Sequence, residues 1–265
     1  MIDPRYYQIS ALTGLLVLGV FRLGFDIPFV CIASILTSVL VTQYACTRFF
    51  RLPHFDPRSA LISGLSLCLL LRSDSWIVLV AAGAFAVLSK FAFRWNGKHI
   101  FNPTNFAVAL CIALNWAWIA PAQWGSATWF AFLLVCLGGL VVTRAERADI
   151  VLVFLASYIG LLFIRALWLG DPLTIPFKQM QSGALLLFTF FMISDPKTTP
   201  DDRRGRVLLA LLVALVAFAF QFQLYNPKGL IYALVLLMPL TVFLDRLFPA
   251  HAYQWPASNP TQELP

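Results

Sequence analysis

The chain has 265 residues, of which 60% are apolar and only 12% charged, whereas soluble domains carry roughly 25% charged residues. Its mean hydropathy is +0.81, and its apolar residues form blocks separated by short charged stretches, as in helical membrane proteins that cross the bilayer several times. This composition excludes an ordinary soluble domain. The formal net charge of +7 is not gathered on one solvated face, as nucleic-acid binding requires, so no nucleic-acid partner is expected.

The N-terminal segment differs from a signal peptide. It contains an acidic residue, Asp3, its apolar run from Ala11 to Phe21 ends at Arg22, and no small-residue cleavage site follows. We therefore expect this run to remain in the protein as the first membrane span.

Ten apolar blocks follow one another along the chain. A helix needs about 20 residues, at 1.5 Å each, to cross the hydrocarbon core of a bilayer. The third and eighth blocks are too short for this and are predicted to be broken half-helices. The ten blocks lie at about 8–24, 27–46, 58–71, 76–93, 104–119, 127–143, 150–168, 183–194, 206–224 and 229–245.

The basic residues predict the orientation of these spans. With ten spans, both termini and the even-numbered connections lie on one side, and that side carries all but five of the 19 Lys and Arg residues. Because Lys and Arg are retained in cytoplasmic loops, we expect an inner-membrane protein with both termini in the cytoplasm. The five on the other side are Arg22, Arg72, Arg165, Lys178 and Lys228.

The two short blocks occupy corresponding places in two halves of the chain. The first contains Ser63-Gly64 and is followed by Ser73-Asp74, and the second begins at Ser182-Gly183 and ends at Ser194-Asp195. Two spans later each half has an Asn-Pro pair, Asn102-Pro103 in the first and Asn226-Pro227 in the second. The shared order predicts an internal repeat of five spans, and an odd number of spans inverts the second copy across the membrane.

The predicted fold class is therefore an all-α integral membrane protein of about ten transmembrane helices. These form two inverted five-helix repeats, with two short broken helices where such folds place their binding sites. Residues 1–249 form a single transmembrane domain, with repeat one at about 8–119 and repeat two at about 127–245. The Pro-rich segment 250–265 is expected to be a flexible tail.

The cysteines and histidines favour no metal, disulfide or haem site. The five cysteines lie within or at the ends of apolar blocks and never approach a CxxC spacing, which is typical of small buried hydrophobic residues. A redox role across a subunit interface is the alternative. The histidines, which are far apart in loops or the tail, are His54, His99 and His251.

Polar groups crowd the start of the fifth block. Asn102 is expected to cap this helix and Pro103 to occupy its first position, where a missing N–H costs nothing. Thr104 and Asn105 add further donors and acceptors. A helix N-terminus with unpaired N–H groups and partial positive charge suits a phosphate or the electron-rich carbonyl edge of a reduced flavin. For Asn226 capping alone is the favoured interpretation.

Asp195 closes the second short block, at the edge of the bilayer. An ionisable group there is a functional candidate, as a partner of a ligand or of an ion. Asp74 is its counterpart in the first half, and both are candidates for binding a coupled cation. The loop that follows, broken by Pro196 and Pro200, is expected to be solvated between Asp201 and Arg204.

Two of these segments carry a resemblance. The run from Phe190 to Pro200, FFMISDPKTTP, together with Phe101–Phe106, FNPTNF, resembles the RnfD and NqrB subunits of the Rnf and Na⁺-pumping NADH:quinone oxidoreductase complexes. The stretch Leu237–Asp245 is also similar, so the resemblance extends from about 55 to 248. It implies ten helices in two repeats, electron transfer through flavins, and partners that include the other membrane subunits, the lipid bilayer and, as a further candidate, quinone.

The resemblance also implies two flavin sites. Family members carry FMN esterified to a Thr of an S-G-A-T motif outside the membrane and bind riboflavin among the helices. Here the corresponding segment reads Gly125-Ser126-Ala127-Thr128, with Gly and Ser exchanged, so Thr128 is a weak candidate for covalent FMN and Thr174 a weaker one. An ordinary helix start capped by Ser126 is the alternative. Noncovalent flavin is favoured, at a site made of Asn102, Pro103, Thr104, Asn105, Asp195, Pro196, Thr198 and Thr199.

The leading hypothesis is a membrane electron-transfer subunit of an Rnf/Nqr-like complex, carrying electrons through a bound flavin and coupled to Na⁺ or H⁺ transport. The sequence contains no Gly-rich dinucleotide loop, so a partner protein of the complex is expected to bind any hydride donor. A secondary transporter that uses Asp74 and Asp195, and a cofactor-free scaffold subunit, are the alternatives.

Overall fold

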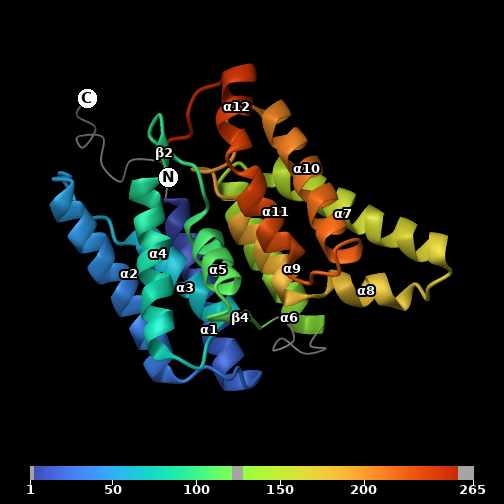
Figure 1. The fold of residues 1–265 in the computed structure, drawn as a ribbon, viewed down its shortest axis with the longest axis horizontal. Coiled ribbons are helices and arrows are strands. Elements are labelled where there is room, and N and C mark those ends of the chain that lie inside the picture. Colours follow the sequence, from blue (N-terminus) through green and yellow to red (C-terminus); the bar gives the residue numbers. More distant parts are fainter. Residues whose placement is uncertain (1–2, 121–127, 256–265) are drawn as a thin grey trace.

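The computed structural model describes residues 3–120 and 128–255, which form helices with a few two-residue strands (Figure 1). In the first half of the chain the helices are α1 (Pro4–Arg22), α2 (Phe29–Phe49), α3 (Arg58–Leu70), α4 (Trp76–Ala92) and α5 (Pro103–Ala113). In the second half they are α6 (Thr128–Arg144), α7 (Ala148–Leu169), α8 (Thr174–Met180), α9 (Gly183–Leu187), the π-helix η1 (Phe188–Met192), α10 (Arg203–Phe222), α11 (Gly229–Leu237) and α12 (Leu240–Leu247).

Three helices, α2, α7 and α10, are each long and apolar enough to cross a membrane. The helices α11 and α12 pass the same test as a pair that is bent by 50°. The break falls at Met238-Pro239, where Pro239 has no N–H to continue the helical hydrogen bonds. These helices, together with the shorter apolar ones beside them, are those of a multi-pass membrane protein.

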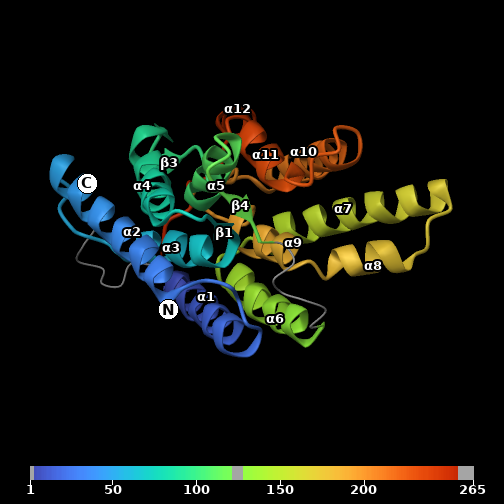
Figure 2. The same ribbon diagram turned by 60° about the horizontal axis from the view of Figure 1, so that its bottom comes forward.

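Each apolar block expected from the sequence coincides with a helix or with two consecutive helices. The third block forms the 13-residue α3, and the eighth forms α9 continued by η1, so neither reaches the length of a full span. Helix α8 has no counterpart among the predicted blocks, and it packs along α7 through the rings of Phe163 and Phe177, 5.2 Å apart. Figure 2 shows α7 and α8 projecting together from the remaining helices.

Two short strand pairs connect the helices of the first half. The extended strand β1 (Leu71–Arg72), directly after α3, pairs antiparallel with β4 (Trp118–Ile119), so the chain leaves the helix without losing its backbone hydrogen bonds. Strands β2 (Arg94–Trp95) and β3 (Lys98–His99) form a hairpin whose turn residues Asn96 and Gly97 have φ of 46° and 77°. This turn directs the chain from α4 back to the start of α5.

The helices of the two halves pack in the same order. In the first half α2 packs on α4 and α4 on α5, with α1 against α3; in the second half α7 packs on α10 and α10 on α11, with α6 against α9 and η1. Close approach is provided by Gly83 of α4, where a Cβ would lie 2.9 Å from Oγ of Ser38, and by Gly229 of α11, where it would lie 2.7 Å from the carbonyl oxygen of Ala217. The halves meet where α1 contacts α6 and α5 contacts α11.

Ion pairs from both halves gather at one end of the helices, where the N-terminus and α12 also lie (Figure 1). Arg5 pairs with Asp3 at 2.6 Å and with Asp56 at 2.5 Å. Lys98, in the β2–β3 hairpin, pairs with Asp201 at 3.0 Å and with Asp245 at 2.7 Å. The connections that the sequence assigns to one side of the membrane therefore meet at one end of the fold, and we call it the charged end.

Candidate functional site

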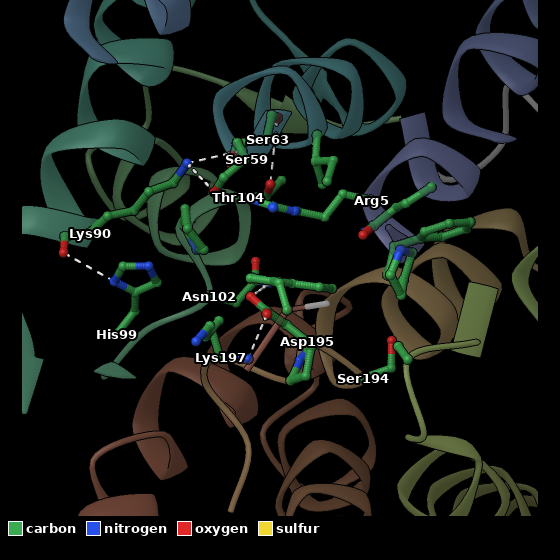
Figure 3. Close-up of a pocket in the computed structure, with 18 of the residues that line it drawn as sticks. Arg5, Ser59, Ser63, Lys90, His99, Asn102, Thr104, Ser194, Asp195 and Lys197 are labelled. Carbon is green, nitrogen blue, oxygen red and sulfur yellow. Dashed lines mark hydrogen bonds between the residues drawn. The ribbon is translucent and has the colours of Figure 1, made fainter. Parts of the chain in front are cut away.

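A cavity of about 270 Å³ opens at the charged end, and both halves of the chain line it. Its apolar wall comes from α3, α4, α6 and η1, and its polar groups come from α1, α2, α3, α4, the start of α5 and the turn after η1 (Figure 3). The volume is just under the roughly 300–1,000 Å³ of small-molecule sites. The apolar residues of the wall include Ile62, Phe91, Val141, Val142, Phe190 and Phe191.

Asn102 joins the two motifs that the sequence analysis singled out. Its Oδ1 accepts a hydrogen bond from the backbone N–H of Asn105 at 3.0 Å, which confirms the predicted helix cap, and Pro103 takes the first helical position. Its Nδ2 donates to Oδ2 of Asp195 at 3.2 Å and to the carbonyl oxygen of Met192 at 3.4 Å. The start of α5 and the end of η1, 93 residues apart in the sequence, thus form one wall of the cavity (Figure 3).

The turn around Asp195 is held by its own hydrogen bonds. The second carboxylate oxygen of Asp195 accepts from the backbone N–H of Lys197 at 3.0 Å, and its carbonyl oxygen accepts from the hydroxyls of Thr198 at 3.3 Å and Thr199 at 3.0 Å. Burial raises the pKa of Asp195, although the hydrogen bond from Lys197 and the charge of Lys90 oppose the shift. Asp195 and Pro196 line the cavity, whereas the buried Thr198 and Thr199 stabilise the turn behind it.

The two residues after Pro103 have different surroundings. Thr104 lines the cavity, and its hydroxyl lies 3.5 Å from the carbonyl oxygen of Ser63 on α3. Asn105 turns away from the cavity, because its Nδ2 donates to the carbonyl oxygen of Ile231 on α11 at 3.1 Å. Its buried Oδ1 has no hydrogen-bond partner among the described residues.

The remaining candidates lie elsewhere. Thr128 is exposed at the start of α6 and does not line the cavity, and the other residues of its motif, 125–127, lie outside the described residues. Thr174 begins α8. Asp74 lies beyond the far end of α3 in a separate hollow of about 340 Å³ that it shares with Asp26 and Arg72. Across residues 3–120 and 128–255, no group of three His, Cys, Asp or Glu residues is placed to hold a metal ion.

The structure adds polar residues to the cavity that the sequence analysis did not select. Lys90, near the end of α4, is only 3% exposed, and its Nζ donates to the carbonyl oxygen and hydroxyl of Ser59 at 2.9 and 3.0 Å. Gln43 of α2 is buried beside the same cavity, and its Oε1 has no partner in the described part of the chain. The sequence signal for both was weak, because a long polar side chain near the end of an apolar block ordinarily reaches out to the membrane surface.

His99 is held next to Lys90. Its Nδ1 lies 3.1 Å from the carbonyl oxygen of Lys90, so the ring donates its proton to that oxygen. Burial, followed by the positive charges of Lys90 and Arg94, lowers the pKa of His99 to about 3. The imidazole is therefore neutral at pH 7 and serves to fix the end of α4 against the hairpin.

The first residues of the C-terminal tail return to the cavity. The backbone N–H of Tyr253 donates to Asp201 at 3.2 Å, and its carbonyl oxygen accepts from Nζ of Lys197 at 2.8 Å. Two residues later the ring of Trp255 lines the cavity, with the guanidinium of Arg5 5.0 Å from the ring centre. The start of α1, the turn after Asp195 and the tail thus all contribute to the lining of the cavity.

Sequence comparisons relate this chain to known proteins. The family model described as the NQR2, RnfD, RnfE family matches residues 115–254. The D subunit of the ion-translocating oxidoreductase complex of Methanosarcina acetivorans is 27% identical over 256 residues, which cover 90% of this chain and 87% of the relative. The D subunit of the proton-translocating ferredoxin:NAD(+) oxidoreductase complex of Clostridium ljungdahlii is 23% identical over 293 residues, which cover 89% and 86%.

A shorter match has a higher sequence identity. The corresponding protein of the ion-translocating oxidoreductase complex of Erwinia tasmaniensis is 36% identical over 105 residues, 38% of this chain and 29% of the relative. The family model covers more than half of the chain, and the relatives in Methanosarcina and Clostridium match nearly all of it. The chain belongs to the NQR2, RnfD, RnfE family of membrane subunits.

Proposed function

We propose that this chain is the RnfD-type membrane subunit of an ion-translocating oxidoreductase complex and that it passes electrons through a flavin bound noncovalently in the cavity at the charged end. The first part is supported by the relatives, which are subunits of such complexes. The second part depends on one observation: the hydrogen bond between Asn102 and Asp195, which brings the two motifs of the family resemblance together at the wall of the cavity.

The proposal includes the architecture of ten membrane helices in two inverted repeats. The matching order of helix packing in the two halves supports it. So does the position of the two short helical segments, α3 and the η1 that continues α9, since α3 and η1 both line the cavity, one from each half. Broken helices from two repeats meet in this way at the binding sites of inverted-repeat membrane proteins.

The residues present fit a flavin ring. The apolar walls contributed by Ile62, Phe91 and Phe191 can flank a planar ring, and the polar groups at its edges include both donors and acceptors. A cavity of about 270 Å³ accommodates a ring system with a short side chain but not a dinucleotide. This favours riboflavin or FMN over larger cofactors.

When bound, the flavin supplies the electron-transfer chemistry, and the protein positions it and sets its electrostatic surroundings. Asn102 and Asp195 fix the start of α5, whose N–H groups and partial positive charge face electron-rich groups. The apolar wall would exclude water from the ring, and Trp255 would contribute to its surroundings from the tail. Other subunits of the complex would bind the electron donor and acceptor, with quinone a candidate acceptor.

The purified full-length protein tests the proposal. In detergent it should show the visible absorption of oxidised flavin, bleached by dithionite, and Asn102→Ala should lower the flavin content. Asn226→Ala is the matched control, because Asn226 accepts a hydrogen bond from the N–H of Lys228 in the other Asn-Pro turn and does not line the cavity. A folded, colourless wild-type protein that takes up no added flavin would refute the proposal.

The same preparation tests the covalent site and the coupled ion. Flavin fluorescence that stays with the band on a denaturing gel, and is lost in Thr128→Ala, would assign FMN to Thr128. For the ion, the rate of electron transfer by the whole complex should depend on Na⁺ or on pH, and Asp74→Asn or Asp195→Asn should weaken that dependence if either carboxylate binds the cation.

A further inference from the structure

Two polar groups line the cavity from neighbouring helices, one without a hydrogen-bond partner and one without an ion-pair partner among the described residues. The first is Oε1 of Gln43, a buried acceptor that receives no hydrogen bond from any described residue. The second is the ammonium group of Lys90, which donates only to Ser59 and has no carboxylate at ion-pair distance within the described residues. Buried acceptors and buried charges are normally paired, so the cavity suits a ligand that offers Gln43 a donor and Lys90 an electron-rich acceptor.

The acids nearest to Lys90 are already engaged. Asp56 accepts from Arg5 at 2.5 Å and from Arg58 at 2.8 Å, and Asp195 is bonded to Asn102. The cations around the cavity therefore outnumber the acids that face it, and the excess includes Lys90. A ligand group that carries or gains negative charge would be stabilised there.

We propose that Gln43 and Lys90 form the specificity end of the cavity, where they recognise a ring edge with an N–H beside a carbonyl. Gln43 Oε1 accepts from the N–H and Lys90 donates to the carbonyl oxygen. This rests on the proposed function, because the pyrimidine edge of a flavin, N3–H between two carbonyl groups, has this pattern. An oxidised quinone presents carbonyl acceptors alone and would leave Gln43 without a donor.

The inference has an electrostatic consequence. Reduction adds electron density to the carbonyl edge of a flavin, and a buried ammonium group stabilises that density more than the oxidised ring. Lys90 therefore shifts the equilibrium toward the reduced cofactor. A purely structural role, in which Lys90 only holds Ser59 at the start of α3, would leave the reduction potential unchanged.

Flavin analogues test the Gln43 contact. The full-length protein, freed of flavin and kept in detergent, is titrated with riboflavin and with 3-methylriboflavin, in which a methyl group replaces the N3 proton. We expect wild-type protein to bind riboflavin about tenfold or more tightly than the analogue, because the analogue leaves Oε1 unpaired. In Gln43→Ala the two affinities should become similar, since the acceptor is gone and the methyl group has room. Ser38→Ala is the control: it lies on the same helix, bonds to Val80 on α4 and does not line the cavity.

The potential of the bound flavin tests Lys90. Lys90→Met should lower the midpoint potential and Lys90→Arg should largely preserve it, whereas Lys178→Met, on α8 and away from the cavity, should leave it unchanged. If wild-type protein binds no riboflavin, both this inference and the proposed function fail. If it binds riboflavin and the 3-methyl analogue equally well, or if the preference persists in Gln43→Ala, the inference is overturned and the proposed function stands. An unchanged potential in Lys90→Met overturns the role of Lys90.

Discussion

The hydrogen bond between Asn102 and Asp195 makes the most direct prediction about the fold of the cavity. Replacing Asn102 by Ala removes two contributions: the cap of α5, typically about 1 kcal/mol, and a hydrogen bond to a charged group, about 1.5–3 kcal/mol. Because Asp195 is partly exposed, we expect the lower part of that range. Asn102→Ala should therefore reduce the free energy of unfolding by about 2.5–3 kcal/mol.

A double-mutant cycle separates the two contributions. Asn102→Ser keeps a capping oxygen and should lose mainly the bond to Asp195. In the cycle of Asn102→Ala and Asp195→Ala, we expect a coupling energy of about 1–2 kcal/mol. The assay is reversible unfolding in mixed micelles, followed by circular dichroism, with each variant measured at the same detergent composition. A coupling below about 0.5 kcal/mol, the scatter of independent sites, would refute the reasoning.

Asn102→Asp adds a test by pH. It preserves the cap but places two carboxylates where Asn102 and Asp195 are now 3.2 Å apart. Two carboxylates at this distance share a proton, so the apparent pKa of the pair rises on folding. Their contribution to stability is then present at low pH and is lost as the pH rises from the ordinary carboxylate pKa through the raised one. Wild-type protein, with a single carboxylate at this place, should show a smaller loss over the same range.

Three further predictions concern other parts of the fold. His99 has a pKa of about 3 in the folded protein, below its ordinary value near 6.5. Its contribution to stability is therefore present above pH 6.5 and falls by up to about 1.4 kcal/mol per pH unit as the pH drops toward 3. In thermal melts, His99→Gln should lose less stability than the wild-type protein between pH 7 and pH 5. In Gly138→Ala the new Cβ would lie 2.5 Å from Cγ of Phe190 and should destabilise the protein by about 1–3 kcal/mol. Its control is Gly139→Ala, whose new Cβ would have nothing within 4 Å and which should be neutral or stabilising. Equal melting temperatures of the two variants would contradict this. Trp255→Ala removes an aromatic ring that lines the cavity and should speed the release of bound flavin in a stopped-flow dilution without changing the helical content. An unchanged release rate would show that the tail does not retain the ligand.

Much of the secondary structure could be predicted from local sequence. The apolar blocks specify helices because only a helix satisfies its backbone hydrogen bonds within one segment in a bilayer. Asn102-Pro103 specified the start of α5 because a cap and a missing N–H act within a few residues. The sequence did not predict α8, whose seven residues are stabilised by packing on α7 through Phe177 and not by a hydrophobic block of their own.

The candidate site could be predicted only in part. The two family motifs pointed to Asn102, Thr104 and Asp195, and the structure brings these residues to one cavity. It places Asn105 against α11 instead, because neighbouring positions on a helix point in different directions and the packing of other helices decides what each of them meets. Thr128 stands apart from the cavity at the start of α6.

Sequence alone determined the membrane class, the helical segments and the two corresponding motifs, since composition, hydrophobic length and capping are local properties. Tertiary structure decided which side chains share the cavity. The pairing of Asn102 with Asp195, the burial of Lys90 and Gln43 at the same cavity, and the return of Trp255 to it all join residues from different helices or loops. Such contacts depend on how helices cross and approach, which no local pattern in one sequence encodes.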